Sequence, residues 1–247
     1  MRQQQTFVFR CNNGFGNKLC NLMNMFYIHE KIPEAIILLD WVVNEHCQLD
    51  IAEIIDLTPY PWIRRAAGRR PTPGEFWACT SVEPTRWDSL EEWKRHRTLV
   101  SISIHLFRFV PREFCRSTFA GFQFHPEILR RVEARGPGRP IVHVRAGDLK
   151  KFLEEACDPT LGDRLRITLQ QLDPSVSVAE YSAEKLERGS DQIRESIADL
   201  LWFSRACTIR GYCPYSHFSS WAFLLSAQWD PTRPVFDYRK THLEILT

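Results

Sequence analysis

The pattern that most limits the fold lies in the first 39 residues, where a strand, a glycine turn, a helix and a second strand follow one another. Residues 6–10 predict a buried strand, and 11–18 (Cys-Asn-Asn-Gly-Phe-Gly-Asn-Lys) predict a tight turn. Apolar residues at 19, 22, 23, 26 and 27 have the spacing of a helix, which ends before Pro33. The apolar run 35–39 is typical of a parallel strand. The segment therefore predicts a βαβ unit with a right-handed crossover and burial on both faces of its sheet.

The rest of the chain continues in the same α/β style. Residues 51–57 predict a short helix, 99–104 a strand and 126–135 a helix, whereas 41–98 are otherwise irregular. The Gly- and Pro-rich segment 135–140 predicts a domain boundary. After it, 141–145 and 207–210 predict strands, and 161–171, 191–206 and 218–229 predict helices. We expect two α/β domains, 1–136 and 137–247, that face one another.

The composition and charge of the chain weaken the case for two classes of protein, nucleic-acid binders and membrane-spanning proteins. The 247 residues are 44% hydrophobic and 25% charged, as in ordinary folded proteins. A net charge of +2 and a pI of about 8.1 weaken the case for a dedicated nucleic-acid binder. No apolar run is long enough to predict a membrane span, and the first ten residues do not resemble a signal peptide. We expect a cytoplasmic protein, with the secretory lumen as the alternative if the chain is truncated.

The eight cysteines predict no metal site, because none form a Cys-x-x-Cys pair and no histidine cluster lies beside them at zinc-like spacing. We expect reduced, mostly buried thiols, with disulfides as the alternative in an oxidising compartment.

Three turns carry residues suited to binding an anion. The first, Gly14-Phe15-Gly16-Asn17-Lys18, lets the backbone approach a ligand at a predicted helix start. It is neither a Walker loop nor a full dinucleotide fingerprint, and a plain βα turn is the alternative. In the second, His143 and Arg145 share one face of a predicted strand and Asp148 follows it. Arginine offers a charged fork suited to a diphosphate. The alternative there is an internal Arg145–Asp148 ion pair with His143 in the core.

The third turn, 215–222, precedes a predicted helix and contains Ser216, Phe218 and Ser219. Hydroxyl and amide groups at a helix start form a second anion site, and simple helix capping is the alternative.

The order of these motifs resembles that of the fucosyltransferase superfamily, which includes protein O-fucosyltransferases, α1,2- and α1,6-fucosyltransferases and nodulation fucosyltransferases. Residues 14–19 resemble its Gly-x-Gly-Asn-Arg/Gln-Leu element, and 143–148 (His-Val-Arg-Ala-Gly-Asp) resemble its His-x-Arg-Arg/x-Gly-Asp motif. Residues 199–204 with 216–222 are similar to its late Asp-Leu-x-x-x-Ser and Ser-x-Phe-Ser-x-Trp-Ala segments. The stretch from Leu39 to Leu57 resembles nodulation-type members.

The resemblance implies a GT-B architecture, which is two Rossmann-like domains with a nucleotide sugar in the cleft, and inverting transfer without a metal or cofactor. It implies that Arg145 holds the β-phosphate of GDP and stabilises the leaving group. The remaining implied contacts to the nucleotide sugar are Gly14, Phe15, Gly16, Asn17, His143, Asp148, Asp158, Ser216, Phe218 and Ser219. Of these, Asn17 is grouped with Arg145 as catalytic.

The chain also departs from the family pattern. Ala146 stands where many relatives have a second arginine, Lys18 replaces an arginine or glutamine, and only about 50 residues separate Asp148 from Asp199. Asp158, in a segment that resembles Phe-Leu-x-x-Asp-Asp-Pro, is assigned to the guanine or ribose. These departures indicate a compact member or a loss of activity.

No general base is evident. Asp40, Glu45, His46 and Asp50 follow the second predicted strand, and each is interpreted as a solvated loop residue. Arginine clusters that alternate with Trp62, Trp77, Trp87 and Trp93 are interpreted as surface charge over a core, with an acceptor-glycan or nucleic-acid surface as alternatives.

The prediction is an inverting, metal-independent transfer of fucose from GDP-fucose to a glycan or protein hydroxyl. The alternatives are another nucleotide sugar on the same fold, or an inactive protein that binds sugar nucleotides or glycans.

Overall fold

The computed structural model describes residues 4–66, 76–78, 89–95, 97–101, 106–107, 109–138, 140–145, 177–181, 189–206, 208–211, 221–222 and 224–225. The chain divides into two compact units, Met1–Ile128 with Arg188–Arg194, and Leu129–Glu187 with Glu195–Thr247. This division passes within helices α4 (Pro126–Glu133) and α7 (Ser190–Ala206). The predicted boundary between residues 136 and 137 stays a prediction.

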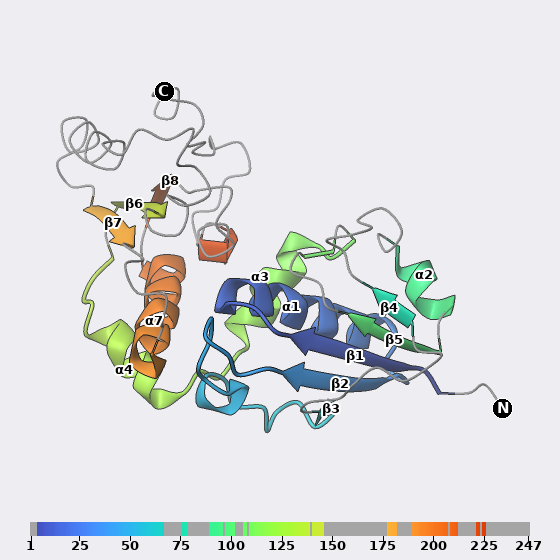
Figure 1. The fold of residues 1–247 in the computed structure, drawn as a ribbon. Helices are drawn as coiled ribbons and strands as arrows, with labels where there is room; N and C mark the ends of the chain where they lie inside the picture. The colour runs from blue at the N-terminus through green and yellow to red at the C-terminus, as the bar shows by residue number, and fades with distance from the viewer. Residues whose placement is uncertain are drawn as a thin grey trace, which may run out of the picture. The chain divides into compact units, whose positions relative to one another are not determined.

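The first unit contains a parallel sheet whose strands have the order β3-β2-β1-β5-β4 (Figure 1). These strands are β1 (Thr6–Cys11), β2 (Ile36–Trp41), β3 (Ile63–Arg65), β4 (Phe76–Ala78) and β5 (Thr98–Ser101). Every pairing in the sheet is parallel, and β1 pairs with β2 from Thr6–Ile36 to Cys11–Trp41. The predicted βαβ unit is therefore confirmed.

Helix α1 (Phe15–Lys31) connects β1 to β2 and begins four residues earlier than the apolar spacing predicts. The prediction was wrong because Gly14 is the N-cap, so the presumed turn residues 15–18 form the first helical turn. The backbone N–H groups of Asn17 and Lys18 both donate to the carbonyl of Gly14. A glycine-rich sequence thus concealed the helix start, because glycine lowers helix propensity.

The core of the first unit forms around aromatic side chains on β1. Trp93, in α2 (Leu90–Arg95), is fully buried; its ring stacks on Phe9 at a centroid distance of 5.7 Å and meets Phe7 edge-on at 5.5 Å. Helices α1 and α3 (Arg112–Ala120) lie on the same face of the sheet (Figure 1). The irregular pattern of 41–98 did not predict β3, β4 or α2, because each has only three to six residues.

The second unit contains a smaller parallel sheet with the order β7-β6-β8. Its strands are β6 (Pro140–Arg145), β7 (Ser177–Tyr181) and β8 (Thr208–Gly211). Helix α7 buries Ile197, Leu200 and Leu201, which confirms the amphipathic pattern predicted for 191–206. The predicted helix 161–171 lies outside the described residues, and only 221–222 and 224–225 of the predicted helix 218–229 are described, as helical.

Short connections complete the described elements. The predicted helix 51–57 is only a 3-10 turn, η1 (Ile51–Glu53), and α4 ends two residues before the predicted end. After α4, Gly136 has φ +71°, a left-handed conformation that favours glycine. The indole of Trp202 donates to the carbonyl of Gly136 at 3.0 Å, which fixes this turn against α7.

Within the described ranges, no helix combines the length and apolar character needed to cross a bilayer.

Candidate functional site

The strand order has a topological switch point at the carboxyl end of β1. From β1 the chain continues to β2 and β3 on one side, and it later adds β5 and β4 on the other. In open parallel sheets, ligands bind at such a switch point, outside the carboxyl ends of the strands. The Gly14-Phe15-Gly16-Asn17 turn follows β1 directly, so the topology brings the first predicted motif to this position.

The Gly14 turn has the features of an anion site. It is the N-terminus of a 17-residue helix, and no acidic residue lies in the first helical turn. The helix dipole and the N–H groups of that turn therefore favour a negatively charged ligand.

Gly14 is not required by the local backbone. Its φ of −63° and ψ of 162° are accessible to any residue. A Cβ at this position would lie 3.8 Å from the backbone oxygen of His46, an ordinary van der Waals distance. A close approach of a ligand to this backbone would explain the glycine, whereas the packing of the described residues does not.

Polar side chains beneath the turn connect it to the neighbouring strands. Lys18 is buried, donates through Nζ to the carbonyl of Val42, and lies 4.4 Å from the centre of the Trp41 ring. Burial lowers the pKa of Lys18. Asn21 donates to the carbonyl of Arg10 at 3.0 Å and accepts from the Ser101 hydroxyl at 3.1 Å. Asn21 thereby joins β1 to β5 across the switch point.

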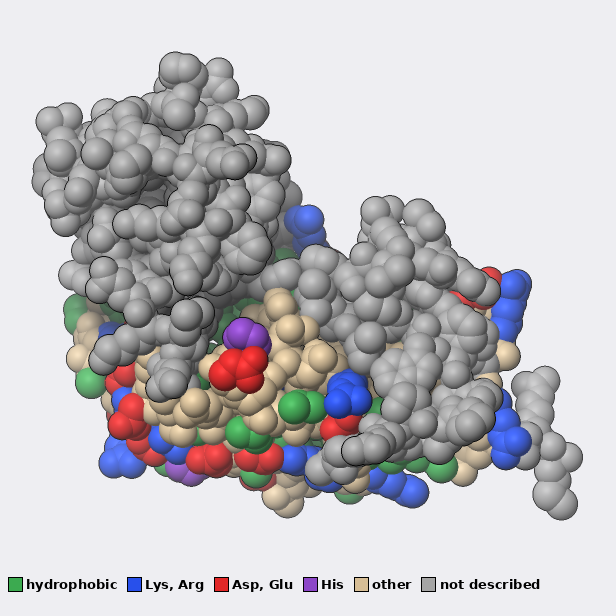
Figure 2. Space-filling view, in the orientation of Figure 1, with side chains coloured by type: hydrophobic (Ala, Val, Ile, Leu, Met, Phe, Trp, Pro, Cys, Tyr) green, Lys and Arg blue, Asp and Glu red, His purple; other side chains and the backbone are tan. Residues whose placement is uncertain are grey.

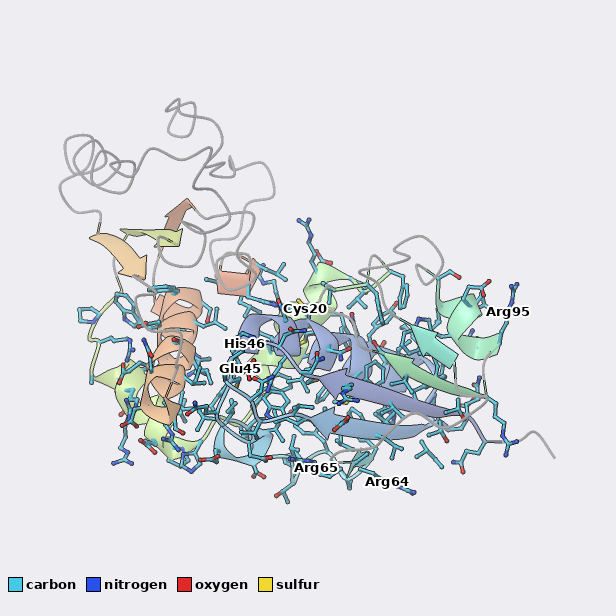
Figure 3. All side chains as sticks on the ribbon, viewed as in Figure 1. Cys20, Glu45, His46, Arg64, Arg65 and Arg95 are labelled. Carbon is cyan, nitrogen blue, oxygen red and sulfur yellow. The ribbon has the colours of Figure 1, made fainter. Side chains whose placement is uncertain are left out.

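The loop that follows β2 forms one side of the turn. Asn44 donates through its side chain to the carbonyl of Asn12, and its own carbonyl oxygen atom Oδ1 accepts from the N–H groups of His46 and Cys47. These bonds position Glu45 and His46 beside the turn, where Figure 3 shows both side chains. The two side chains are 69% and 57% exposed, and histidine and acidic side chains are visible on this surface in Figure 2.

Two of the four titratable residues after the second strand differ from their predicted solvated state. Asp40 lies within β2, is 1% exposed and faces Arg10 at 3.6 Å, so its assignment to a solvated loop was wrong. Asp50 caps η1 and pairs with both terminal nitrogens of Arg65 at 2.9 and 2.6 Å. Hydrogen bonding from Arg65 lowers the pKa of Asp50.

The second predicted motif lies at the equivalent position of the second sheet. His143 and Arg145 are in β6, the central strand, and Arg145 is its last residue, opposite Tyr181 of β7. The pairing of β6 with β8 shifts register between Ile141 and Val142. Such irregularities are common next to functional sites. Both motifs thus occupy the carboxyl end of a central parallel strand.

The other predicted contacts are not described structurally. Asp148, Asp158, Ser216, Phe218 and Ser219 lie outside the described residues. Their assignment stays a prediction.

The late motif that begins at Asp199 has a structural role in the second unit. Asp199 accepts from Nε of Arg135 at 2.6 Å, and the Ser204 hydroxyl donates to the carbonyl of Leu201. Burial raises the pKa of Asp199, and the Arg135 guanidinium opposes this rise. Arg135 also contacts Glu195 at 2.7 Å.

Of the tryptophans among the arginine clusters, Trp93 is buried and Trp62 is half-buried. Trp93 has no exposed surface, and the Trp62 ring stacks on His29 at 3.9 Å. Arg95 pairs with Glu92 at 2.6 Å. Trp93 agrees with surface charge over a tryptophan-bearing core, whereas Trp62 is not part of that core. Among all the residues that the structure describes, no group of three or more His, Cys, Asp or Glu side chains is arranged to hold a metal ion.

Comparison with solved structures shows which fold the chain has. It is similar to the NodZ α-1,6-fucosyltransferase soaked with GDP-fucose, with a TM-score of 0.54 and 15% identity over 91% of this chain and 93% of that one. It is also similar to selenomethionine NodZ from Bradyrhizobium, with a TM-score of 0.56 and 14% identity over 91% and 93%. For POFUT1 in complex with GDP-fucose, the TM-score is 0.52 and the identity 12% over 95% and 98%. No family model matches the sequence, and no curated protein matches it.

These similarities confirm the predicted fold class. The chain has the α/β GT-B fold of fucosyltransferases, as the order of the motifs indicated. At 12–15% identity, the likeness concerns the fold alone.

Proposed function

We propose that this chain is a glycosyltransferase that transfers fucose from GDP-fucose to a hydroxyl group of a glycan or protein, with inversion and without a metal. The observation that carries the proposal is the position of two motifs. Gly14–Asn17 and His143–Arg145 each occupy the carboxyl end of the central strand of a parallel sheet. Solved structures with this fold contain GDP-fucose or GDP.

The chemistry required of these residues is neutralisation of charge. When the bond between the anomeric carbon and the β-phosphate oxygen breaks, GDP leaves with an additional negative charge. In the proposal Arg145 binds the β-phosphate and, with His143, stabilises that charge, which is usually the largest contribution to such catalysis. The N-terminus of α1, which has no acidic residue in its first turn, favours a negatively charged group of the donor at Gly14, Gly16 and Asn17.

The first test is calorimetric titration with GDP, UDP and ADP, each with and without EDTA. We expect GDP to bind selectively and the affinity to survive EDTA. Selective UDP binding would keep the fold and change the donor. GDP binding without turnover of GDP-fucose would favour an inactive binding protein, and no binding to any nucleotide would contradict the proposal.

The second test is the substitution Arg145→Ala, with release of GDP from GDP-fucose as the assay. Removing one group that stabilises a developing anion lowers kcat by roughly 10²–10³. Arg95→Ala is the matched control, because Arg95 is 70% exposed and pairs with Glu92 on α2. Equal rates for the two variants would contradict the role of Arg145.

A further inference from the structure

We propose that His46, whose imidazole lies next to the Glu45 carboxylate, is the general base that deprotonates the attacking hydroxyl group. This inference rests on the proposed function, because the base acts on the hydroxyl group that receives the fucose in the proposed transfer. The sequence alone did not single out His46 among four titratable residues. The structure separates them by their contacts.

The position of His46 follows from the bonds of its loop. Asn44 joins the loop to Asn12, at the end of β1, and the backbone oxygen of His46 lies within van der Waals reach of position 14. Both contacts are within the first unit. The backbone of His46 therefore lies beside the Gly14 turn, where the proposal has the sugar and its phosphates.

The Glu45 carboxylate lies next to the imidazole of His46. Nε2 of His46 lies 3.4 Å from Oε1 of Glu45. A neutral imidazole carries its proton on one nitrogen and can accept a proton at the other. With Nε2 next to the carboxylate, the proposal gives the proton of the acceptor to Nδ1. Both side chains are more than half exposed, so an acceptor can reach them.

The other charged groups around this loop are engaged elsewhere. Asp40 is buried against Arg10, and Asp50 holds Arg65 while it caps η1. Two groups beneath the loop are also unsuited to take the proton of the acceptor. Lys18 donates to the carbonyl of Val42, and burial raises the pKa of the Cys11 thiol to about 12. The buried Cys47 thiol faces the carbonyl of Leu49. Among the described residues at this edge, Glu45 and His46 are therefore the titratable pair open to an acceptor.

The step balances as a simple displacement. Nδ1 of His46 takes the proton of the acceptor hydroxyl, and the acceptor oxygen forms a bond to the anomeric carbon of fucose. The bond from that carbon to the β-phosphate oxygen breaks, and its electron pair leaves with GDP. The imidazolium then returns its proton to water.

The experiment measures GDP release from GDP-fucose with water as the acceptor, so no glycan has to be identified. Four proteins are compared: wild type, His46→Ala, Glu45→Gln and Val43→Ala. Val43 is in the same loop and 50% exposed, so its variant controls for disturbance of the loop. GDP titration accompanies each protein, because the base is not needed for nucleotide binding.

We expect His46→Ala to bind GDP as tightly as wild type and to lose about 10²–10⁴ in kcat, the usual contribution of a general base. Glu45→Gln should lose less, and Val43→Ala should match wild type. Added imidazole should restore part of the His46→Ala rate, a response that a structural role would not produce.

Two results would overturn the inference, and they are distinguishable. If wild type turns over and His46→Ala keeps its kcat, His46 is not the base and the proposed function stands. If wild type neither binds GDP nor releases it from GDP-fucose, the proposed function fails together with the inference.

Discussion

Among the described residues, neither the backbone nor the packing at position 14 requires a glycine. Its backbone dihedral angles suit any residue, and an added Cβ would meet only ordinary contacts. Other single residues at this site do have structural explanations. Lys18 is buried beside Trp41 and bonds the next loop, and Asn21 joins two strands. Lys18 and Asn21 therefore pack the turn, whereas Gly14 leaves space for a ligand next to the backbone.

The substitution Gly14→Ala tests this distinction. Alanine is a poorer N-cap than glycine, but it also reduces the entropy of the unfolded chain, so we expect the free energy of unfolding to change by less than about 1 kcal/mol. The affinity for GDP-fucose should fall by at least about tenfold, because a methyl group displaces the ligand from the backbone. Thermal unfolding and calorimetric titration measure the two effects. A variant that is as stable as wild type and binds equally well would show that nothing approaches this turn.

At the scale of elements, α4 and α7 are joined within the second unit by charged groups at the end of α4. Arg135 bonds Asp199 at 2.6 Å and Glu195 at 2.7 Å, and Arg131 also pairs with Glu195. Burial works to raise the pKa of Glu195, but hydrogen bonds from Arg135 and Arg131 hold it below the ordinary value. The pKa of Asp199 is raised by its burial. The ionised form of Asp199 therefore depends on Arg135.

We expect Arg135→Met to lower the free energy of unfolding by about 2–3 kcal/mol at pH 7, somewhat less than for a fully buried pair. A raised pKa means that the folded state binds the proton of Asp199 more tightly than the unfolded state does. The free energy of unfolding therefore rises as the pH falls through that raised pKa, and it decreases again as the pH rises. The deficit of Arg135→Met should shrink between pH 7 and pH 4.5 in urea titrations.

The double variant Arg135→Met/Asp199→Asn is the matched control. It leaves no carboxylate at position 199, so it should be more stable than Arg135→Met at pH 7. A deficit in Arg135→Met that is the same at both pH values would contradict this account.

At the scale of the whole molecule, nucleotide binding should raise the free energy of unfolding. A ligand that binds only the folded state at a hundred times its Kd raises the free energy of unfolding by about 2.7 kcal/mol. We expect this rise with GDP in wild type and in Arg64→Ala, because Arg64 is an exposed residue of β3 (Figure 3). The rise should be lost in Arg145→Ala at the same GDP concentration. Thermal unfolding followed by calorimetry measures it, and an equal response of all three proteins would exclude Arg145 from the site.

Much of the fold could be predicted because the chain's long elements carry periodic burial. The βαβ pattern of 6–39 and the helix 191–206 each expose their apolar spacing in the sequence, and both are confirmed. The strands β3 and β4 and helix α2 were not predicted, because three to six residues are too short to display a period. These short elements are stabilised by their neighbours in the structure, and that information is not local.

For the candidate site, the sequence by itself determined the chemistry available: two glycines at a helix start, a histidine and an arginine at the end of a strand, and a motif order that resembles fucosyltransferases. Only the tertiary structure decided that both motifs lie at the carboxyl ends of central strands, since strand order depends on long-range pairing. It also distinguished four neighbouring titratable groups, because burial and ion pairing arise from residues distant in sequence. Asp40 faces Arg10, Asp50 faces Arg65, and His46 remains exposed beside Gly14.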